Sequence, residues 1–365
     1  MLNFSPEEKK RIDECLERIE TNLSKEEMTP LERLTTAEAH KEPDRVPVWL
    51  CSLEHNAYVA GYTISEILKD PKKAAISGLV TLAEYGCDTV SAYAEPHIIG
   101  SEFLGVEIEY PEDSSPMLRK FPLQEDISKL EKLKIPDPYK DGNIPIVLES
   151  IKLLHEKIGD KIPIWQNTNG PFGYAGDIRG YDKLLMDLRK NPDFVHELMK
   201  FAVEVSYTVN KAIRDCGALP FMFDAMGSPS IIGVKDYEEF IQPYEKEVIS
   251  RLKPPVYLGG SHVIEALEQY VDTGATGIML KAPADFVKAK KLIGERITLV
   301  IVEILTNPLR SGNPQEIEKI AKRNIKACAK GGGFVLAAGI VPYDAPKENC
   351  IAVMEAARKY GRYYK

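Results

Sequence analysis

Several features that quickly assign a chain to a functional class are missing from this 365-residue sequence. No apolar run approaches the roughly 20 residues that cross a bilayer, and the charged, amphipathic start lacks the apolar core of a signal peptide. There is no P-loop, no G-x-G-x-x-G fingerprint on a first strand–helix turn and no G-x-S-x-G elbow. We therefore expect no membrane anchor, no nucleotide chemistry and no classical serine hydrolase.

Paired cysteines and an excess of positive charge are missing as well. The six cysteines are scattered without a C-x-x-C pair, which predicts reduced thiols and a cytoplasmic protein. Lysine and arginine number 47 against 55 aspartates and glutamates, so the formal net charge is −8. This balance argues against nucleic acid, whose binding needs a basic face, and against anionic membrane surfaces.

What the chain does contain is an alternation of short apolar runs and amphipathic helical stretches. Residues 1–40 are predicted to form an N-terminal helical extension, because apolar residues recur there at helical spacing. The predicted strands are Val46–Leu50, Thr89–Tyr93, Ile162–Asn167, Leu219–Asp224, Val256–Gly259, Gly277–Leu280, Thr298–Glu303 and Phe334–Ala337. The clearest predicted helices are Ile64–Tyr85, Pro192–Cys216, Tyr237–Leu252, Ile264–Thr273, Pro283–Ile293, Pro314–Lys330 and Asn349–Tyr360.

This order of elements predicts the fold class. Roughly eight strand–helix units in one direction indicate an α/β fold, a (β/α)8 TIM barrel over residues 41–365 in one domain. A flavodoxin-like doubly wound sheet is the alternative. Two segments lie outside the alternation: GVEIEYPEDSSP at 105–116 predicts a hairpin outside the barrel, and KIPDPYKDGN at 134–143 predicts an irregular connection.

In a barrel of this kind the chemistry lies at the C-terminal ends of the strands, so the candidate residues are those that follow each apolar run. After the second strand, Glu95 and His97 can be an acid/base pair, a metal pair or an orienting pair, with a surface salt bridge as the alternative. After the third, amides and aromatic rings suit a flat organic ligand, which makes substrate-binding candidates of Asn167, Asn169, Phe172 and Tyr174. A turn that caps the next helix is an equally good reading of Asn169.

The fourth strand ends in a carboxylate among apolar neighbours. The pKa of Asp224 should be raised there unless the group is paired, and Asp224 is a candidate catalytic residue. Capping of the next helical turn is the alternative. The neighbouring Met222 is assigned to substrate binding.

The later strand ends add a tyrosine, a histidine, a lysine and a glutamate. PVYLGGSH contributes Tyr257 and His262 beside two glycines, which let the chain pass close to another group. Lys281 is a catalytic candidate at the end of the sixth strand, and Glu303 is a substrate-binding candidate at the end of the seventh. A simple ion pair between these two side chains is the alternative.

Several stretches, taken in order, resemble a known family. They are EPDRVPVW, AGYTISEILKDPKKAAISGL, YGCDTVSAY, EFLGVEIEYPEDSSP, GPFGYAG, FDAMGSPS and GGGFVLAAGIVPYDAPKEN. From about Thr29 to the C-terminus, the chain resembles the uroporphyrinogen decarboxylase superfamily, and more closely its corrinoid-dependent methyltransferase branch. The fold that this resemblance implies is a (β/α)8 barrel, in agreement with the alternation of elements.

Departures from the superfamily's patterns narrow the resemblance. True decarboxylases carry an arginine-rich run soon after the first strand, whereas WLCSLEHNAYVAGYT contains no arginine. Thiol-methylating members of the branch hold zinc with a His-x-Cys after strand five and a Cys after strand eight. Here Tyr257 and Gly259 stand in place of the His-x-Cys, and Ala338 and Gly339 stand where the Cys would follow strand eight. No metal ligands are therefore assigned, and zinc stays an open question.

The first methyltransferases of corrinoid O-demethylase systems are the group that this chain resembles best. The resemblance implies an enzyme that moves a methyl group from a methoxylated, often aromatic, compound to the Co(I) of a corrinoid (cobalamin) carried by a separate small corrinoid-binding protein. A homodimer is a further expectation for this branch. Because an alkoxide or phenoxide leaves poorly, a proton donor should add roughly 10²–10⁴ in rate. The candidate donors, and the carboxylates that would orient them, are His97, His262, Tyr257 and Lys281, with Asp224 or Glu95.

Two other hypotheses stay open at this point. One is a decarboxylase of the same superfamily that acts on a small acid and delivers a proton from Asp224 or Glu95. The other is a non-catalytic barrel that binds a ligand without turnover. Release of carbon dioxide without a corrinoid would favour the former, and binding unaffected by replacement of His97 and His262 would favour the latter.

Overall fold

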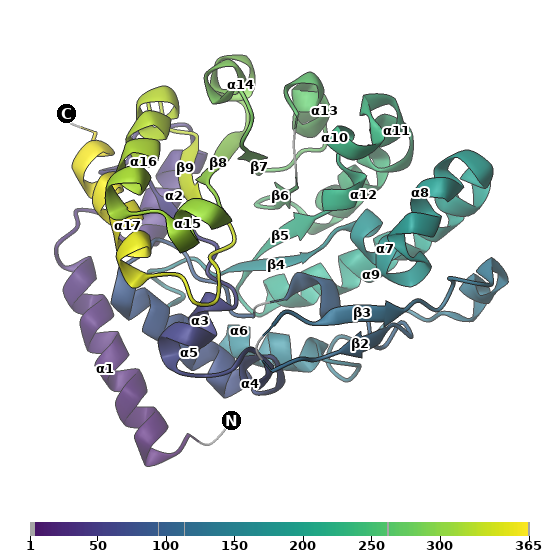
Figure 1. The fold of residues 1–365 in the computed structure, drawn as a ribbon, viewed down its shortest axis with the longest axis horizontal. Helices are drawn as coiled ribbons and strands as arrows, with labels where there is room; N and C mark the ends of the chain where they lie inside the picture. Colours follow the sequence, from purple (N-terminus) through teal and green to yellow (C-terminus); the bar gives the residue numbers. More distant parts are fainter. Residues whose placement is uncertain (1–3, 94, 113, 261–262, 364–365) are drawn as a thin grey trace.

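The computed structural model describes residues 4–93, 95–112, 114–260 and 263–363. At its centre lies a parallel sheet of seven strands in the order β1-β9-β8-β7-β6-β5-β4, which curls so that its two edges approach each other (Figure 1). The strands are β1 (Val48–Leu50), β4 (Trp165–Asn169), β5 (Leu219–Phe223), β6 (Tyr257–Gly259), β7 (Gly277–Lys281), β8 (Thr298–Ile304) and β9 (Phe334–Ala338).

An extended segment fills the gap between β1 and β4 and completes the (β/α)8 TIM barrel. The N–H of Asp88 donates to the Val48 carbonyl at 3.0 Å, and the N–H of Trp165 donates to the Val90 carbonyl at 2.8 Å. The strand predicted at Thr89–Tyr93 is nevertheless reduced to one bridge, between Val90 and Ile164. Further along, the side-chain amide of Gln166 donates to the Tyr93 carbonyl and takes the place of a regular ladder bond.

Helices surround the sheet, as Figure 1 shows. Those that follow β1 are α3 (His55–Ala60), α4 (Ile64–Lys69), α5 (Pro71–Tyr85), α6 (Ile144–Ile158), α7 (Pro171–Arg179), α8 (Tyr181–Lys190) and α9 (Pro192–Asp215). Those that follow β5 are α10 (Pro229–Ile232), α11 (Val234–Phe240), α12 (Gln242–Leu252), α13 (Leu267–Asp272), α14 (Phe286–Ile293), α15 (Thr306–Ser311), α16 (Pro314–Cys328) and α17 (Lys347–Tyr360). Within the described residues, no helix is long and apolar enough to cross a membrane.

Two of the predicted helices are interrupted for local reasons. The helix predicted at Ile64–Tyr85 is split at Asp70, whose carboxylate accepts the N–H of Lys72 at 2.8 Å and caps α5. A proline follows at the first position of α5, where its missing N–H costs nothing. The helix predicted at Tyr237–Leu252 is likewise split, at Ile241, into α11 and α12.

The predicted N-terminal helices are α1 (Pro6–Leu23) and α2 (Pro30–Glu38), and a capping box starts each of them. Helix α1 packs on α5. Helix α2 lies at the N-terminal ends of the strands, because the Ala37 carbonyl accepts from Gly333 just before β9 and Glu38 accepts from the Tyr257 hydroxyl at the start of β6. A domain division at residue 40 stays a prediction.

Inward-facing aromatic rings close the barrel above α2. They belong to Trp49, Trp165, Phe221 and Tyr257, and we call them the aromatic floor. The ring centroids of Trp165 and Tyr257 lie 4.6 Å apart, and those of Trp49 and Phe221 lie 4.9 Å apart. All four side chains are fully buried, so the barrel is solid at this level.

A two-stranded hairpin lies outside the barrel, as predicted. Its strands are β2 (Glu107–Glu109) and β3 (Met117–Lys120), which pair antiparallel. The hairpin extends beyond the predicted end at residue 116, because the second strand begins only after Pro116. All six cysteines are free and buried, in agreement with the expectation of reduced thiols.

Candidate active site

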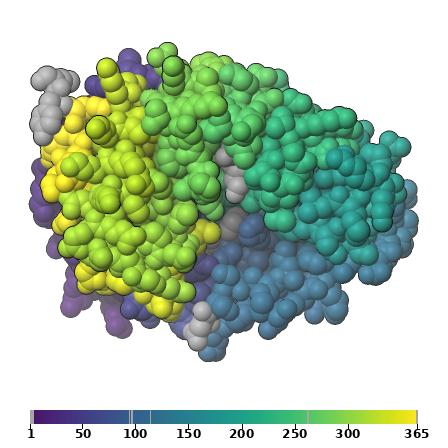
Figure 2. Space-filling view, turned by 45° about the horizontal axis from the view of Figure 1, so that its top comes forward, coloured from purple at the N-terminus to yellow at the C-terminus, as the bar shows by residue number. Residues whose placement is uncertain are grey.

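A cavity of about 430 Å³ lies above the aromatic floor, at the C-terminal ends of the strands. Figure 2 shows this face of the molecule hollowed near its centre, where blue, green and yellow-green segments meet. The volume falls within the range of small-molecule sites. The lining residues are Trp49, Cys51, Leu53, Glu54, Glu95, His97, Ser115, Pro116, Asn167, Phe223, Ala225, Gly260, Met279, Lys281, Val302, Ala338, Gly339 and Ile340.

Four of the residues predicted from the sequence meet in this cavity. Glu95 and His97 follow the extended segment beside β1, Asn167 lies on β4, and Lys281 ends β7. They are far apart in the sequence and come together because parallel strands end at the same rim. The position of these four residues therefore agrees with the strand-end argument, whereas their roles stay predictions.

Glu54 and Glu95 form a pair of carboxyl groups on one wall of the cavity. Both are nearly buried, and they are hydrogen-bonded to each other. Burial, and then the adjacent Glu54, raise the pKa of Glu95 well above its usual value of 4.5. Since a second negative charge beside Glu54 is unfavourable, the carboxyl group of Glu95 keeps its proton to a higher pH than an exposed glutamic acid does.

The hairpin supplies a contact to this pair. The hydroxyl of Ser115, in the connection before β3, donates to Glu54 Oε1 at 2.5 Å. Pro116 lines the cavity beside it. The hairpin thus forms part of the cavity wall. Its Ser115 hydroxyl also bonds Glu95 and lowers the pKa of that group, against the larger raising effects of burial and Glu54.

His97 lies in η1 (Pro96–Ile98) and opens onto the cavity. Its Nδ1 is 3.2 Å from Oδ1 of Asn169, and Nδ2 of that amide donates to Asp177 Oδ2 at 2.6 Å. Burial of the ring lowers the pKa of His97 below its usual value of 6.5. The imidazole is therefore neutral at pH 7.

Three other polar groups line the cavity. Cys51 follows β1, and burial raises the pKa of its thiol to about 12, so the sulfur is protonated. The side-chain amide of Asn167 lies 3.7 Å from this sulfur. Lys281 is the basic side chain of the lining and has partial access to solvent.

The described residues do not fit a zinc site of the thiolate type. No group of three or more His, Cys, Asp or Glu side chains in the described part of the chain is placed to hold a metal ion. The Tyr257 hydroxyl donates to Glu38 of α2, on the far side of the aromatic floor, and Gly259 offers no ligand. Ala338 and Gly339 line the cavity without ligand atoms on their side chains. His262 lies outside the described residues.

Three predicted residues lie behind the cavity rather than in it. Asp224 Oδ1 accepts the N–H of Gly173 at 2.6 Å and holds the start of α7. Burial raises its pKa to about 6, and it is hydrogen-bonded to Glu245. Phe172 and Tyr174, both on α7, are completely buried, and the Tyr174 hydroxyl donates to the Ile99 carbonyl. The alternative reading of Asp224 as a helix cap describes its contacts, although the capped helix is α7.

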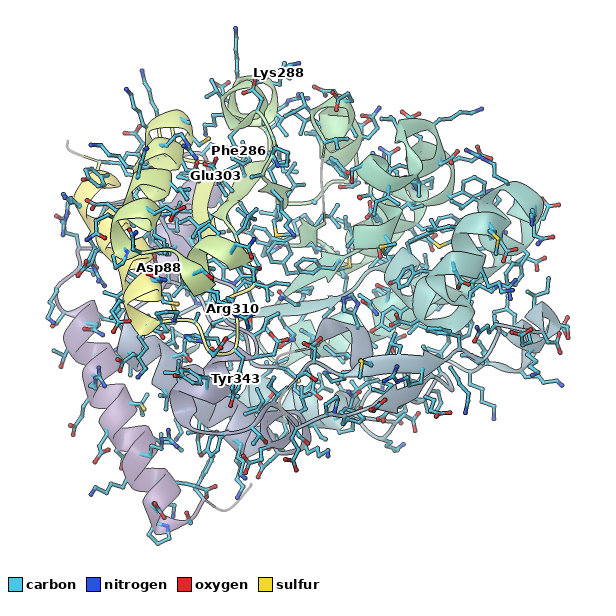
Figure 3. The ribbon with its side chains drawn as sticks, in the orientation of Figure 1. Asp88, Phe286, Lys288, Glu303, Arg310 and Tyr343 are labelled. Atoms are coloured by element: carbon cyan, nitrogen blue, oxygen red, sulfur yellow. The ribbon has the colours of Figure 1, made fainter. Side chains whose placement is uncertain are left out.

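Three more predicted residues do not reach the cavity. Met222 faces outward on β5, where its sulfur lies 3.9 Å from the Ser206 hydroxyl of α9. Glu303 (Figure 3) lies at a register shift in β8, and its carboxylate pairs with Arg323 of α16 at 2.6 Å. The alternative of a Lys281–Glu303 pair is therefore wrong. Tyr257 faces inward but belongs to the aromatic floor, one layer below the cavity.

Sequence reasoning missed Glu54, Cys51 and Ser115. The strand-end rule could have found the first two, because both follow β1 directly in the stretch WLCSLEH. Ser115 carries no comparable signal. It reaches the cavity only because the hairpin folds back over the barrel mouth, which is a long-range arrangement.

Comparisons with known proteins agree with this architecture. The family model described as "Uroporphyrinogen decarboxylase (URO-D)" matches residues 29–360. The chain is 26% identical over 348 residues to "Methylcobamide:CoM methyltransferase MtaA" of Methanosarcina barkeri, which covers 92% of this chain and 99% of the relative. It is 27% identical over 354 residues to "Methylcobamide:CoM methyltransferase MtbA" of Methanosarcina acetivorans, with the same coverage.

Two further comparisons concern a decarboxylase sequence and a solved structure. The chain is 26% identical over 257 residues to "Uroporphyrinogen decarboxylase" of Pseudomonas fluorescens, covering 65% of this chain and 70% of the relative. The solved structure of a "methyltransferase from Methanosarcina mazei" superposes with a TM-score of 0.82 at 24% identity and covers 92% of this chain and 99% of that one. This likeness supports the same fold for both chains.

Proposed function

Because this chain belongs to the uroporphyrinogen decarboxylase family, we propose that it is a corrinoid-dependent methyltransferase. It moves a methyl group from a methoxylated, aromatic compound to the Co(I) of a corrinoid held by a separate small protein. The names of the relatives, two of which are methylcobamide methyltransferases, support methyl transfer and a corrinoid partner. They do not bear on the methyl donor, for which the support comes from the cavity.

The observation that carries the proposal is the proton-holding carboxyl pair in the cavity. A thiol acceptor of methyl groups is activated by loss of a proton on soft ligands, and the described cavity offers no such ligand set. An ether that gives up its methyl group must instead gain a proton on the departing oxygen. The raised pKa of Glu95 supplies a carboxylic acid that keeps its proton to a higher pH than an ordinary glutamic acid.

The proposed methyl transfer conserves atoms and charge. When bound at the cavity mouth, the corrinoid supplies a nucleophilic electron pair and accepts the methyl group. As the methyl–oxygen bond breaks, the proton of Glu95 passes to the departing oxygen, which leaves as an alcohol or phenol. The Glu54–Glu95 pair is then fully charged, with Lys281 lining the same cavity, and regains its proton from solvent.

The walls of the cavity favour a flat, apolar donor. Trp49, Phe223, Met279 and Val302 present aromatic and aliphatic surface beside the polar groups of the lining. A ring of this kind can lie on the apolar wall with its ether oxygen toward Glu95. The open end of the cavity at the C-terminal face leaves room for a corrinoid protein to approach.

One anaerobic experiment tests the proposal. The protein is mixed with reduced cob(I)alamin and a panel of methoxyarenes, and the cobalt spectrum is followed with and without a candidate corrinoid protein. We expect growth of the methylcob(III)alamin band with some donors and its loss in Glu95→Gln. The matched control is Glu268→Gln, which removes an exposed carboxylate of α13 far from the cavity. No reaction with any donor in the panel would contradict the proposal.

Lys281 favours one competing function, which the same assay separates. A lysine beside a protonated carboxylic acid can hold a substrate carboxylate while the acid protonates the carbon left after loss of carbon dioxide. That is the chemistry of a decarboxylase acting on a small acid. Release of carbon dioxide in the absence of any corrinoid would replace the methyl-transfer proposal with this one.

A further inference from the structure

We infer that His97 faces the cavity as a hydrogen-bond acceptor, with its hydrogen on Nδ1 and none on Nε2, and that Asn169 and Asp177 are the positioning residues that hold it so. The catalytic meaning of this arrangement rests on the proposed function. The arrangement itself is a property of the free protein. It also gives His97 a role opposite to that of Glu95, since an imidazole of this form cannot protonate a leaving group.

A continuous chain of hydrogen bonds leads from the cavity into the protein. It begins at Nδ1 of His97, which contacts Oδ1 of Asn169 at 3.2 Å. It continues from Nδ2 of Asn169 to Oδ2 of Asp177 at 2.6 Å. The hydroxyl of Ser101 contacts the same Oδ2 at 2.9 Å. Asn169, Asp177 and Ser101 are completely buried, so water does not compete for these bonds.

The chain has a direction because its inner end is an acceptor. The Asn169 amide donates to Oδ2 of Asp177 at 2.6 Å, while the single hydrogen of the Ser101 hydroxyl is shared between the same Oδ2 at 2.9 Å and the His97 carbonyl at 2.8 Å. The nitrogen of the amide must therefore face Asp177, and its oxygen must face His97. Since an amide oxygen only accepts, Nδ1 of His97 must carry the hydrogen of the neutral ring. Nε2 is then left with a lone pair.

A proton on Oδ1 of Asp177 does not reverse this direction. Oδ1 is buried and has no hydrogen-bond partner among the described residues. A proton on that oxygen leaves Oδ2 free to accept from Asn169 as before. The direction therefore holds for the charged carboxylate and for the acid protonated on Oδ1, whereas a proton on Oδ2 would make that oxygen a donor.

Packing holds the amide of Asn169 in place. The residue lies on β4 in register with Phe223, and its backbone carbonyl accepts from the Ser206 hydroxyl at 3.2 Å. Gly173 of α7 lies against the side chain, and a Cβ at that position would come within 2.9 Å of the Asn169 Cγ. A rotation of the amide therefore needs movement of α7, which the bond from Gly173 to Asp224 opposes.

The cavity consequently offers a ligand two opposite groups, a proton donor and an acceptor. Glu95 can give a proton, and Nε2 of His97 can only accept a hydrogen bond or a proton. The charged and titratable groups that line the same cavity are Glu54, Glu95 and Lys281, together with the neutral thiol of Cys51. A methyl donor that places its ether oxygen at Glu95 would be oriented by a hydrogen that it donates to His97.

The tautomer can be read directly by nitrogen-15 NMR. Two-bond proton–nitrogen correlation spectra of the full chain distinguish protonated from unprotonated ring nitrogens, and His97→Gln assigns the His97 signals. The matched control is His196→Gln, which removes a histidine of α9 that bonds the Tyr244 hydroxyl instead. We expect His97 to show hydrogen on Nδ1 and none on Nε2. Hydrogen on Nε2 in the unaltered protein would overturn the inference.

Variants of Asp177 test the positioning role. Asp177→Leu removes the acceptor and frees the amide to turn, so a second His97 tautomer should appear and methyl transfer should fall about tenfold, the size of one lost orienting hydrogen bond. Asp177→Asn keeps an acceptor oxygen and should restore both the tautomer and the rate. A His97 spectrum unchanged in a folded Asp177→Leu variant would refute the role of Asp177.

A second variant and a comparison of two results distinguish failure of the tautomer assignment from failure of the proposed function. If Asp177→Leu does not fold, Asn169→Ser removes the amide directly and should mix the His97 tautomers, while an unmixed spectrum would count against the inference. If the unaltered protein shows hydrogen on Nδ1 but transfers no methyl group, the proposed function fails and the tautomer assignment stands.

Discussion

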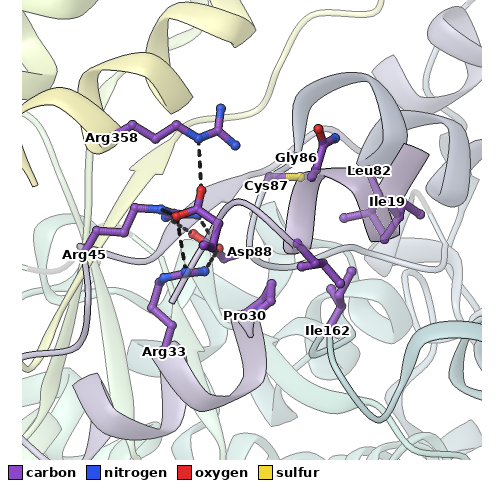
Figure 4. A pocket seen from close by; sticks show the side chains of 13 residues that line it. Ile19, Pro30, Arg33, Arg45, Leu82, Gly86, Cys87, Asp88, Ile162 and Arg358 are labelled. Carbon is purple, nitrogen blue, oxygen red and sulfur yellow. Dashed lines mark hydrogen bonds and ion pairs between the residues drawn. The ribbon is translucent and has the colours of Figure 1, made fainter. Parts of the chain in front are cut away.

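Two groups of buried carboxylates lie at opposite ends of this barrel, and their surroundings are opposite too. At the N-terminal ends of the strands, Asp88 lies among arginines, as Figure 4 shows. Its oxygens contact Arg33 at 2.6 Å and Arg45 at 2.7 Å, and one of them also accepts the N–H of Val48 at 2.7 Å. At the C-terminal ends, Glu95 lies beside another carboxyl group, Glu54, and the Ser115 hydroxyl.

The two surroundings move the pKa values in opposite directions. Burial alone would raise the pKa of Asp88, but the charges of Arg45 and Arg33 overcome it and lower the pKa below 3.8. Burial also raises the pKa of Glu95, and there the neighbouring charge adds to the effect. The lesson is that burial by itself does not mark a carboxyl group as functional, whereas burial without a cation in the wall of a cavity makes it a candidate.

The largest expected effect comes from breaking the N-terminal cluster. Asp88→Asn leaves two buried guanidinium groups without their shared carboxylate, which should lower the free energy of unfolding by about 3–5 kcal/mol. Urea denaturation followed by circular dichroism measures this change. The control is Glu268→Gln, whose exposed pair with Arg296 should matter far less. An equal loss of unfolding free energy in both variants would contradict the structural role assigned to Asp88 at its end of the barrel.

The next effect comes from the other end. Glu95→Gln keeps the shape of the side chain but removes the proton donor, so methyl transfer should fall by roughly 10²–10⁴. Stability should stay unchanged or rise, because no buried carboxyl pair remains. The measurement combines the cobalt assay with urea denaturation of the same preparation. A variant that loses stability and keeps its rate would assign Glu95 to structure, like Asp88.

The pH dependence of stability should separate the two ends with opposite signs. Asp88 has a lowered pKa in the folded state, so its stabilisation is complete above 3.8 and disappears as the pH falls through the lower folded value. Glu95 has a raised pKa, so its favourable contribution is present below 4.5 and is lost as the pH rises through the higher folded value. Urea denaturation of wild type, Asp88→Asn and Glu95→Gln across pH measures both trends.

A smaller effect is expected at the aromatic floor. Tyr257→Phe removes the hydroxyl that donates to Glu38 and should lower the free energy of unfolding by about 1 kcal/mol. Methyl transfer should be unchanged, because the hydroxyl lies beneath the cavity and away from the reacting groups. A Tyr257→Phe variant with normal stability and a strongly reduced rate would restore the sequence-based assignment of Tyr257 as a proton donor.

The fold was largely predictable because its elements carry local signals. Apolar runs such as Thr298–Glu303 are buried on both faces in a parallel barrel and stand out in the sequence. The segment after Asp88 was harder, because the Gln166 side chain replaces part of its backbone pairing. The break before α5 was missed although Asp70 and Pro71 signal it.

The site was less predictable because position along a strand does not give direction. The register shift at Glu303 turns this side chain outward to Arg323, and alternation along β5 sends Met222 outward while Phe223 lines the cavity. Position along a strand also does not give depth in the barrel: Tyr257 faces inward but lies one layer below the cavity. Glu95, His97, Asn167 and Lys281 were found because each lies near the C-terminal end of its strand and lines the cavity.

The aromatic floor has a consequence for the order of events in a catalytic cycle. Because Trp49, Trp165, Phe221 and Tyr257 seal the barrel beneath the cavity, the cavity is a dead end that opens on one side. Under the proposed function, a small donor and a large protein partner must share this single entrance. The donor then enters first, and the demethylated product departs only after the partner has withdrawn. Steady-state kinetics should therefore follow a compulsory sequence in which excess partner inhibits turnover.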